Sequence, residues 1–277
     1  MHRGTIVLVD IKQSRVVIAA DSRVATIGEK PDDHRCKITA LGEKMIFAAA
    51  GIAGSNHTVL KSLNWDASKD AVEAFKTIHN TVPPKINDPV EAVAAEWEKK
   101  MKVRYTREER TALIDLLGST TNDVLLDSVF VGLDAHGQIT ARELSFTFNR
   151  ARAQKGGFAP VISSNQLWTI PAAMTLKAMG HSEIALEFAS QASPRANIEF
   201  RRWQLEMLNR RNEDPDVLYL EHLIHLEITY ATPNAGVGGD IDIASLDSGG
   251  TIQWIRRKRE CPEDSLTLAR SGPQKSQ

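Results

Sequence analysis

Four residues near the start of the chain supply the groups that a hydrolase with a hydroxyl nucleophile requires. Such an enzyme needs a hydroxyl, a base to take its proton, a cation that tunes the base, and N–H donors for the oxyanion. Thr5 offers the hydroxyl and Lys37 the cation. Asp21 can hold the lysine, and Gly51 lets a substrate approach its backbone closely.

The Gly4-Thr5 junction suggests where the base comes from. If the peptide bond between these residues is cleaved, Thr5 becomes the first residue and its own α-amine can accept the proton. The reference pKa of an α-amine is about 7.7–8.0, so much of it is neutral near physiological pH. A neighbouring lysine ammonium lowers that pKa further, which makes Lys37 the natural tuning group.

Each of these residues also has a purely structural interpretation. Thr5 is a good β-former, and Asp21 can cap a strand end or pair with Arg23. Lys37 can face solvent from a strand, and Gly51 can simply permit a tight turn. A buried aspartate needs a partner, however, and Lys37 would supply it, so both interpretations of Asp21 can hold together.

Over residues 4–54 the chain resembles the β-type subunits of the proteasome, within the N-terminal-nucleophile (Ntn) hydrolases. Gly4-Thr5 matches the junction at which those subunits cleave themselves. Asp21, in "AADSR", and Lys37, in "CKI", match the aspartate and lysine of the family, sixteen and thirty-two residues after the threonine. Gly51, in "AAAGIAG", matches the glycine whose N–H helps to form the oxyanion hole. All four spacings agree without a gap, and the late "VGGDIDIASLDSGG" is a looser match.

The resemblance implies a fold and an activity. The fold is α+β: a four-layer αββα sandwich of two stacked antiparallel sheets flanked by helices. The activity is that of a threonine-type amidohydrolase or peptidase, whose nucleophile Thr5 is exposed by autocleavage. Asp21 would hold Lys37, and the Gly51 N–H would stabilise the oxyanion. The substrate would be a peptide or amide, no cofactor or metal is implied, and homo-oligomers are expected because proteasome relatives form rings.

The chain also departs from the catalytic subunits of that family. Val237 and Asn234 stand where those subunits have a serine and an aspartate around the late Gly-Gly pair. The second active-site serine of the family, in a Ser-Gly turn, has no clear counterpart. Ser163 and Ser164 lie in about the right region without the motif.

Other interpretations therefore stay open. The same fold can serve as a catalytically inactive scaffold or assembly subunit, or as an amidase for a small non-peptide substrate. A one-residue insertion in the turn 12–15 would put Gly4 rather than Thr5 at the nucleophile position, but nothing else supports that gap.

The pattern of the chain predicts blocks of strands and helices rather than their alternation, which favours a layered α+β domain. Strand pairs are expected over 5–11 and 15–21, 36–41 and 44–50, 124 to about 147, and 237–257. Helices are expected over 54–64, 67–80, from Asp88 to near Gly118, over 181–192 and on to about 210, and from Asp214. Residues 148–170 look irregular, with short strand candidates. We expect one domain over residues 1–260 and a flexible polar tail over 261–277.

Composition sets broader expectations. A net charge of −1 over 277 residues gives no drive toward nucleic acid or membranes, and we expect neither as a partner. Two cysteines make no disulfide framework; Cys36 is expected in the core, and Cys261 lies far away in sequence. The default is a reducing, cytoplasmic compartment, although a removed secretory leader stays open. His222 and His225 suggest a helix face rather than a metal site.

Overall fold

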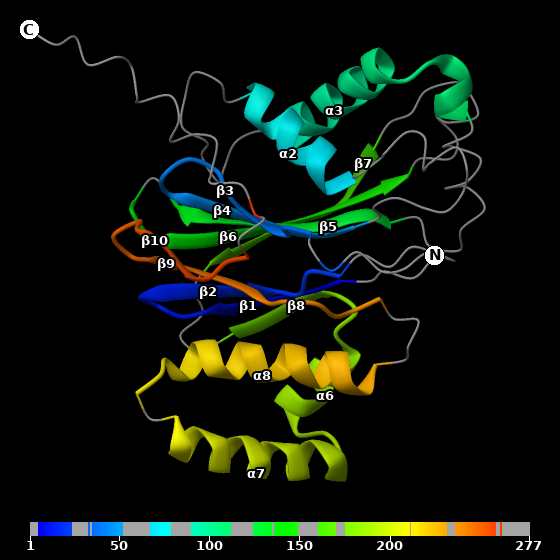
Figure 1. Cartoon of the computed structure of the whole chain (residues 1–277). Coiled ribbons are helices and arrows are strands. Elements are labelled where there is room, and N and C mark those ends of the chain that lie inside the picture. The colour runs from blue at the N-terminus through cyan, green and yellow to red at the C-terminus, as the bar shows by residue number, and fades with distance from the viewer. Residues whose placement is uncertain are drawn as a thin grey trace, which may run out of the picture.

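Two antiparallel sheets, each of five strands among the described residues, form the centre of the protein (Figure 1). The computed structural model describes residues 5–23, 33, 35–51, 67–78, 90–111, 124–134, 136–148, 160–169, 175–210, 212–231, 236–258 and 261. With the helices described below, this arrangement confirms the expected α+β class with antiparallel strands.

The first sheet has the strand order β10-β9-β2-β1-β8. Its strands are β1 (Ile6–Ile11), β2 (Arg15–Ala20), β8 (Thr175–Gly180), β9 (Asp242–Asp247) and β10 (Ile252–Arg256). The predicted hairpins β1–β2 and β9–β10 are present. The pairing of β8 with β1 was not predicted, and its register places Gly180 opposite Ile6.

The second sheet has the strand order β3-β4-β5-β6-β7. Its strands are β3 (Ile38–Ala40), β4 (Met45–Gly51), β5 (Val124–Leu133), β6 (Ile139–Phe148) and β7 (Pro160–Thr169). The prediction that residues 148–170 are irregular with only short strands is wrong, because β7 is a ten-residue strand. Its polar centre, "SSNQ", hides the strand from sequence patterning, yet β7 pairs with β6 and lies at the sheet edge, where polar residues are common.

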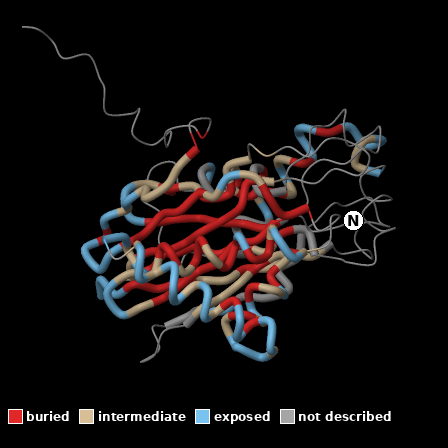
Figure 2. Tube along the Cα trace, turned by 60° about the horizontal axis from the view of Figure 1, so that its bottom comes forward, coloured by how far each residue is buried: buried red, intermediate tan, exposed pale blue. Residues whose placement is uncertain are grey.

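A hydrophobic cluster contains buried residues from both sheets. In β1 it contains Val7, Val9 and Ile11, while Ile6 and Leu8 belong to a second cluster on the other face. This division follows from the alternation of side chains along a strand. By the same alternation Thr5 falls on the face of Val7, toward the other sheet. Figure 2 shows the buried strands as the continuous interior of the protein.

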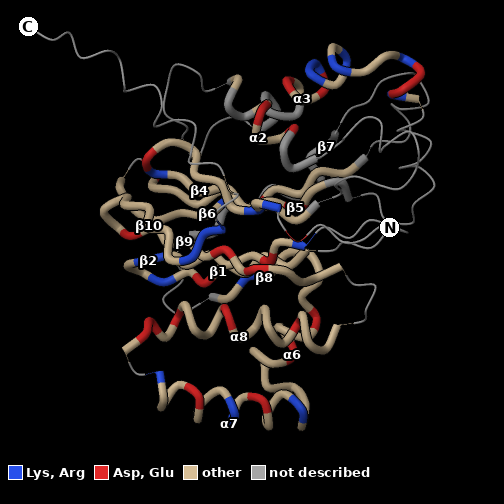
Figure 3. The backbone as a smooth tube through the Cα atoms, in the orientation of Figure 1, with Lys and Arg blue, Asp and Glu red and all other residues tan. Residues whose placement is uncertain are grey.

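Three helices follow one another beside the first sheet (Figure 1): α6 (Glu183–Ser190), α7 (Pro194–Asn209) and α8 (Pro215–Tyr230). Helix α8 contacts β1 and β2. It begins as predicted, with Asp214 as the N-cap, which accepts hydrogen bonds from the N–H groups of Asp216 and Val217, and with Pro215 in the first turn. Acidic and basic residues alternate along the outermost helix, α7 (Figure 3).

Two helices contact the second sheet: α2 (Ala67–Ile78) and α3 (Val90–Arg104). Trp97 and Met101 are buried, as the predicted apolar face of α3 requires. The prediction that this helix runs to near Gly118 is wrong, because it ends at Arg104. Thr106 and Glu109 then exchange the hydrogen bonds of a capping box and start a new helical turn. The expected helix over 54–64 lies outside the described residues.

Cys36 and Cys261 form a disulfide, with Cα atoms 5.6 Å apart. The expectation of unpaired cysteines, with Cys36 as a plain core residue, is therefore wrong. Their separation of 225 residues in sequence concealed a contact that only the fold creates. Because the two cysteines are paired, they no longer indicate a reducing, cytoplasmic compartment. It attaches Cys261 to the folded domain, whereas residues 262–277 lie outside the described part of the chain.

None of the described helices combines the length and the apolar character that crossing a membrane requires.

Candidate active site

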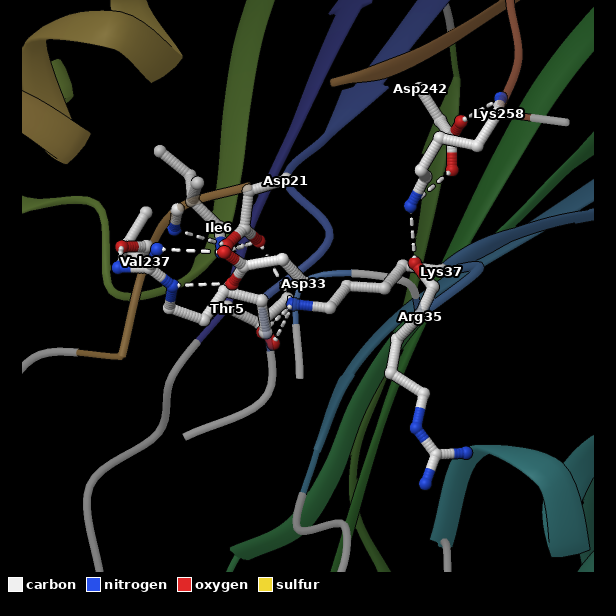
Figure 4. A network of polar contacts seen from close by, with 11 residues as sticks. Thr5, Ile6, Asp21, Asp33, Arg35, Lys37, Val237, Asp242 and Lys258 are labelled. Atoms are coloured by element: carbon white, nitrogen blue, oxygen red, sulfur yellow. Dashed lines mark hydrogen bonds and ion pairs between the residues drawn. The ribbon is translucent and has the colours of Figure 1, made fainter. Parts of the chain in front are cut away.

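Thr5, Asp21 and Lys37 lie in direct contact at one end of the β1–β2 hairpin (Figure 4). The Lys37 Nζ donates to Thr5 Oγ1 over 2.5 Å, to Asp21 Oδ1 over 2.9 Å and to the carbonyl oxygen of Arg23 over 2.6 Å. All three residues are buried: the exposed fraction is 4% for Thr5, 0% for Asp21 and 7% for Lys37. The structure thus assembles three of the four residues that the sequence singled out.

The hairpin register explains why Asp21 reaches the start of β1. Val7 pairs with Ala20, so Asp21 falls opposite Ile6, the residue after Thr5. The Asp21 N–H donates to the Ile6 carbonyl, and the Ile6 N–H donates to Asp21 Oδ1 over 3.0 Å. The polar turn of the hairpin thus determines which two residues meet at its open end.

Three acceptors around the Lys37 Nζ indicate that this side chain is a protonated ammonium. The hydroxyl oxygen, the carboxylate oxygen and the carbonyl oxygen each accept one hydrogen bond from Nζ. An ammonium has three N–H donors and no acceptor, so this set of partners satisfies it completely. Lys37 therefore fits the role of a fixed cation beside Thr5 better than that of a base.

The carboxylate of Asp21 is fully enclosed and bonded on both oxygens. Its second oxygen, Oδ2, accepts the N–H of Gly238 over 2.9 Å. Burial raises the pKa of Asp21 above its ordinary value, while the Lys37 ammonium and then the Gly238 N–H oppose that rise. The ionised form thus depends on the lysine, which makes Asp21 and Lys37 one electrostatic unit.

The late Gly-Gly pair holds the aspartate end of the site. The Gly238 carbonyl accepts the N–H groups of Ser22 and Arg23. A Cβ on Gly239 would overlap the Ser22 hydroxyl, so the close approach requires glycine. Val237, which stands where the resembling subunits have a serine, is buried, and its carbonyl accepts from Arg23 Nη1 over 3.4 Å. Asn234 lies outside the described residues.

Strand β8 brings a segment to Thr5 that the sequence did not point to. The His181 N–H donates to the Thr5 carbonyl over 2.7 Å. Gly180 has a φ of 78°, and a Cβ there would overlap the same carbonyl. The imidazole Nδ1 of His181 lies 2.7 Å from Oε1 of the buried Glu227, whose Oε2 accepts the Ala185 N–H. The only sequence signal for this segment is the short run "MGHS" before a helix.

Ser163 and Ser164 lie elsewhere. Both belong to β7, the edge strand of the second sheet, whereas Thr5 precedes β1 in the first sheet. The turn that adjoins Thr5 is Gly180–Ser182. This turn carries His181 and Ser182, and the His181 N–H contacts the Thr5 carbonyl.

Gly51 ends β4, where it pairs with Leu126 of β5. The side chain of the preceding residue, Ala50, approaches the first sheet, since a Cβ on Gly180 would lie 3.1 Å from its Cβ. Because Gly180 also adjoins the Thr5 carbonyl, the end of β4 lies near the threonine. Gly51 is placed beside this contact, and its oxyanion role stays a prediction.

Among the described residues, no group of three or more His, Cys, Asp or Glu side chains is placed to hold a metal ion. His222 and His225 lie on α8, and burial lowers the pKa of His222.

No protein-family model matches the chain, and no curated protein matches it. The geometry of the site and the motifs that surround Thr5 therefore indicate the function.

The ion pair predicts strong energetic coupling between its two members. Lys37→Met leaves the Asp21 charge buried without its cation, so we expect it to lower the free energy of unfolding by about 3–5 kcal/mol. Asp21→Asn alone should also destabilise. The double variant should lose clearly less than the sum of the two single losses, because neither charge remains. Denaturant unfolding of the four proteins measures this cycle, and strictly additive losses would contradict the coupling.

The raised pKa of Asp21 predicts how stability depends on pH. The folded state holds the Asp21 proton more tightly than the unfolded state, whose aspartate has the ordinary pKa of 3.8. The contribution of this group to stability is therefore fully present below pH 3.8 and is lost as pH rises through the folded-state pKa. The unfolding free energy of the wild type minus that of Asp21→Asn should fall with rising pH in this window. A flat or rising difference would contradict the assignment.

Proposed function

We propose that this protein is a threonine-type amidohydrolase or peptidase, with Thr5 as an N-terminal nucleophile exposed by cleavage of the Gly4–Thr5 bond. One observation carries the proposal: a buried lysine ammonium, anchored to a buried aspartate, donates to the Thr5 hydroxyl over 2.5 Å. A threonine that serves only as a β-former has no need of such a partner. The gap-free spacing of Gly4-Thr5, Asp21, Lys37 and Gly51 supports the same conclusion.

The proposal extends to the architecture. We assign the chain the four-layer αββα sandwich of the Ntn hydrolases. Two features support this assignment: α8 contacts β1 and β2 of one sheet, and α2 and α3 contact β4, β5 and β7 of the other. The hydrophobic cluster that combines residues of both sheets supports the face-to-face stacking between them.

The proposed reaction follows from the atoms around Thr5. Hydrolysis of the Gly4–Thr5 bond frees the α-amine. The Oγ1 then attacks a substrate carbonyl carbon while the α-amine, directly or through a water molecule, takes the hydroxyl proton. The tetrahedral intermediate collapses to an ester as the substrate nitrogen leaves with that proton. Water hydrolyses the ester, which releases the acid product and restores the Thr5 hydroxyl.

The surrounding groups act on charge and on position. The Lys37 ammonium lowers the pKa of the adjacent amine, so that more of it is in the neutral, basic form. Asp21 holds the ammonium in place. The Gly51 N–H is assigned to the developing oxyanion, and the His181 N–H orients the Thr5 peptide by its hydrogen bond to the carbonyl. The substrate class is peptides or amides, no cofactor is needed for this chemistry, and a homo-oligomer is proposed from the resemblance alone.

One observation favours a second candidate, an inactive scaffold or assembly subunit. The buried Val237 has no hydroxyl to help organise the Thr5 amine, unlike the serine of the catalytic subunits that the sequence resembles. In that case Gly4–Thr5 would stay intact. An amidase for a small non-peptide substrate would use the same chemistry as the peptidase, and a panel of peptide and small amide substrates separates these two.

Intact mass spectrometry of the purified full chain tests the proposal. We expect the wild type to lose Met1–Gly4, because the Thr5 hydroxyl cleaves its own preceding bond. Thr5→Ala should retain these residues, and Thr5→Ser, which keeps a hydroxyl, should lose them. Lys37→Arg keeps a cation but changes its shape and reach, so we expect slower processing.

The matched control is Lys44→Met. Lys44 is a solvent-exposed lysine just before β4, so this variant should process like the wild type. Retention of Met1–Gly4 in the wild type, together with no hydrolysis of peptide or amide substrates, would reject the enzyme and favour the scaffold. Equal loss of Met1–Gly4 in Thr5→Ala would assign the cleavage to another protease.

A further inference from the structure

A second buried lysine, Lys258, bonds to the backbone of the segment that carries Lys37 (Figure 4). Its Nζ donates to the Arg35 carbonyl oxygen over 2.5 Å and lies 3.1 Å from Asp242 Oδ2. The side chains of Lys258 and Asp242 are only 3% and 1% exposed. A buried ammonium requires acceptors on all sides, so the Arg35 carbonyl is held firmly by this lysine.

The two buried acid–lysine pairs are built alike, and their aspartates lie next to each other at the ends of two paired strands. Asp242, at the start of β9, pairs with Ala20 of β2, the residue just before Asp21. Each lysine bonds its own aspartate and also a backbone carbonyl, of Arg23 for Lys37 and of Arg35 for Lys258. The second oxygen of Asp242, Oδ1, accepts the Lys258 N–H over 3.0 Å, which fixes the backbone at Lys258 as well.

The disulfide holds the next residue of the same segment. Cys36 stands between Arg35 and Lys37, and its partner Cys261 donates its N–H to the Lys258 carbonyl over 3.2 Å. One short stretch after β10 therefore makes two consecutive attachments to residues 35 and 36. We call this set, Asp242, Lys258, Cys36 and Cys261, the C-terminal clamp.

Regular secondary structure begins only after the residues that the clamp holds. Strand β3 starts only at Ile38, has three residues and lies at the edge of its sheet. Backbone hydrogen bonds from the Arg35 N–H to the Ser22 carbonyl and from the Ala49 N–H to the Lys37 carbonyl also support it. The position of the Lys37 ammonium against Thr5 is therefore sensitive to the attachments at Arg35 and Cys36.

We propose that the C-terminal clamp positions Lys37 against Thr5, and that a thiol reductant weakens this positioning by opening the disulfide. This inference rests on the proposed function, and it names Lys258 and Asp242 as positioning residues. In the redox step a dithiol is oxidised to its disulfide while the Cys36–Cys261 bond is reduced. Two electrons and two protons pass to the protein, which then carries two free thiols.

The effect on the reaction follows from the short distance between the lysine and the nucleophile. A displacement of about 1 Å at a reacting group can cost about 10²-fold in rate. A displaced Lys37 also acts less strongly on the Thr5 amine. Opening the clamp should therefore slow the reaction of Thr5 and move its pH dependence upward.

The experiment measures the rate of labelling by a threonine-directed epoxyketone as a function of pH. The wild type is compared with its disulfide intact and after treatment with dithiothreitol, alkylation by iodoacetamide and removal of both reagents. We expect labelling to slow by about 10- to 100-fold, with its pH midpoint raised. A merely structural role would lower the fraction of protein that is labelled but leave the midpoint of the remainder unchanged.

Variants separate the two parts of the clamp. Cys36→Ser/Cys261→Ser should show the slow rate without any reductant and should not respond to dithiothreitol. Lys258→Arg, which keeps a buried cation, should retain most of the wild-type rate. Asp242→Asn/Lys258→Met removes both charges without leaving one unpaired, and it should be slow with a raised pH midpoint.

Equal rates and equal midpoints for the oxidised and the reduced, alkylated wild type would overturn the inference. If the oxidised wild type is not labelled at all, the proposed function fails instead, and Lys37 has no reaction to support. In that case, hydrogen exchange at the amides of residues 35–37 tests by itself whether the clamp holds this segment. Faster exchange there after reduction supports it, and unchanged exchange rejects it.

Discussion

The buried ammonium of Lys37 is the constraint on which the site depends. A positive charge enclosed between two sheets is costly unless all its protons find acceptors. Thr5, Asp21 and the Arg23 carbonyl supply them, and all three lie at the open end of the β1–β2 hairpin. The same requirement that stabilises the fold at this point places a cation on the threonine hydroxyl. The Lys37 side chain thus both stabilises the fold at this point and supplies the cation beside the proposed nucleophile.

The surroundings of this charge are arranged to keep it in position. Gly238 binds the far oxygen of Asp21, and β8 holds the Thr5 carbonyl through His181. Between the sheets, Asp242 and Lys258 repeat the acid–lysine pairing beside the segment that carries Lys37. These supports come from the end of β8 and from the residues around the last strand pair, whereas Thr5 and Asp21 adjoin the first strand pair. The site therefore exists only in the complete fold and not in any one segment.

Much of the fold and of the candidate site could be predicted from the sequence. The features that could not be predicted share one cause, which is that contacts between distant residues determine them. The hairpins and the α8 cap follow from local patterns, and the resemblance to proteasome β-type subunits implied that Thr5, Asp21 and Lys37 form one site. Both missed strands, β7 and β8, lie at sheet edges, where pairing with a neighbour outweighs weak alternation. The Cys36–Cys261 bond and the His181 contact join residues far apart in sequence, and no local signal reports such contacts.

We infer that Thr5 is a free N-terminal nucleophile tuned by Lys37. Tandem mass spectrometry after reaction with a threonine-directed epoxyketone tests it most directly, because the method identifies the modified residue. We expect an adduct on a peptide that begins with Thr5, formed by the wild type and lost or strongly reduced in Lys37→Met. An unmodified wild-type peptide that still contains the intact Gly4–Thr5 bond would contradict it.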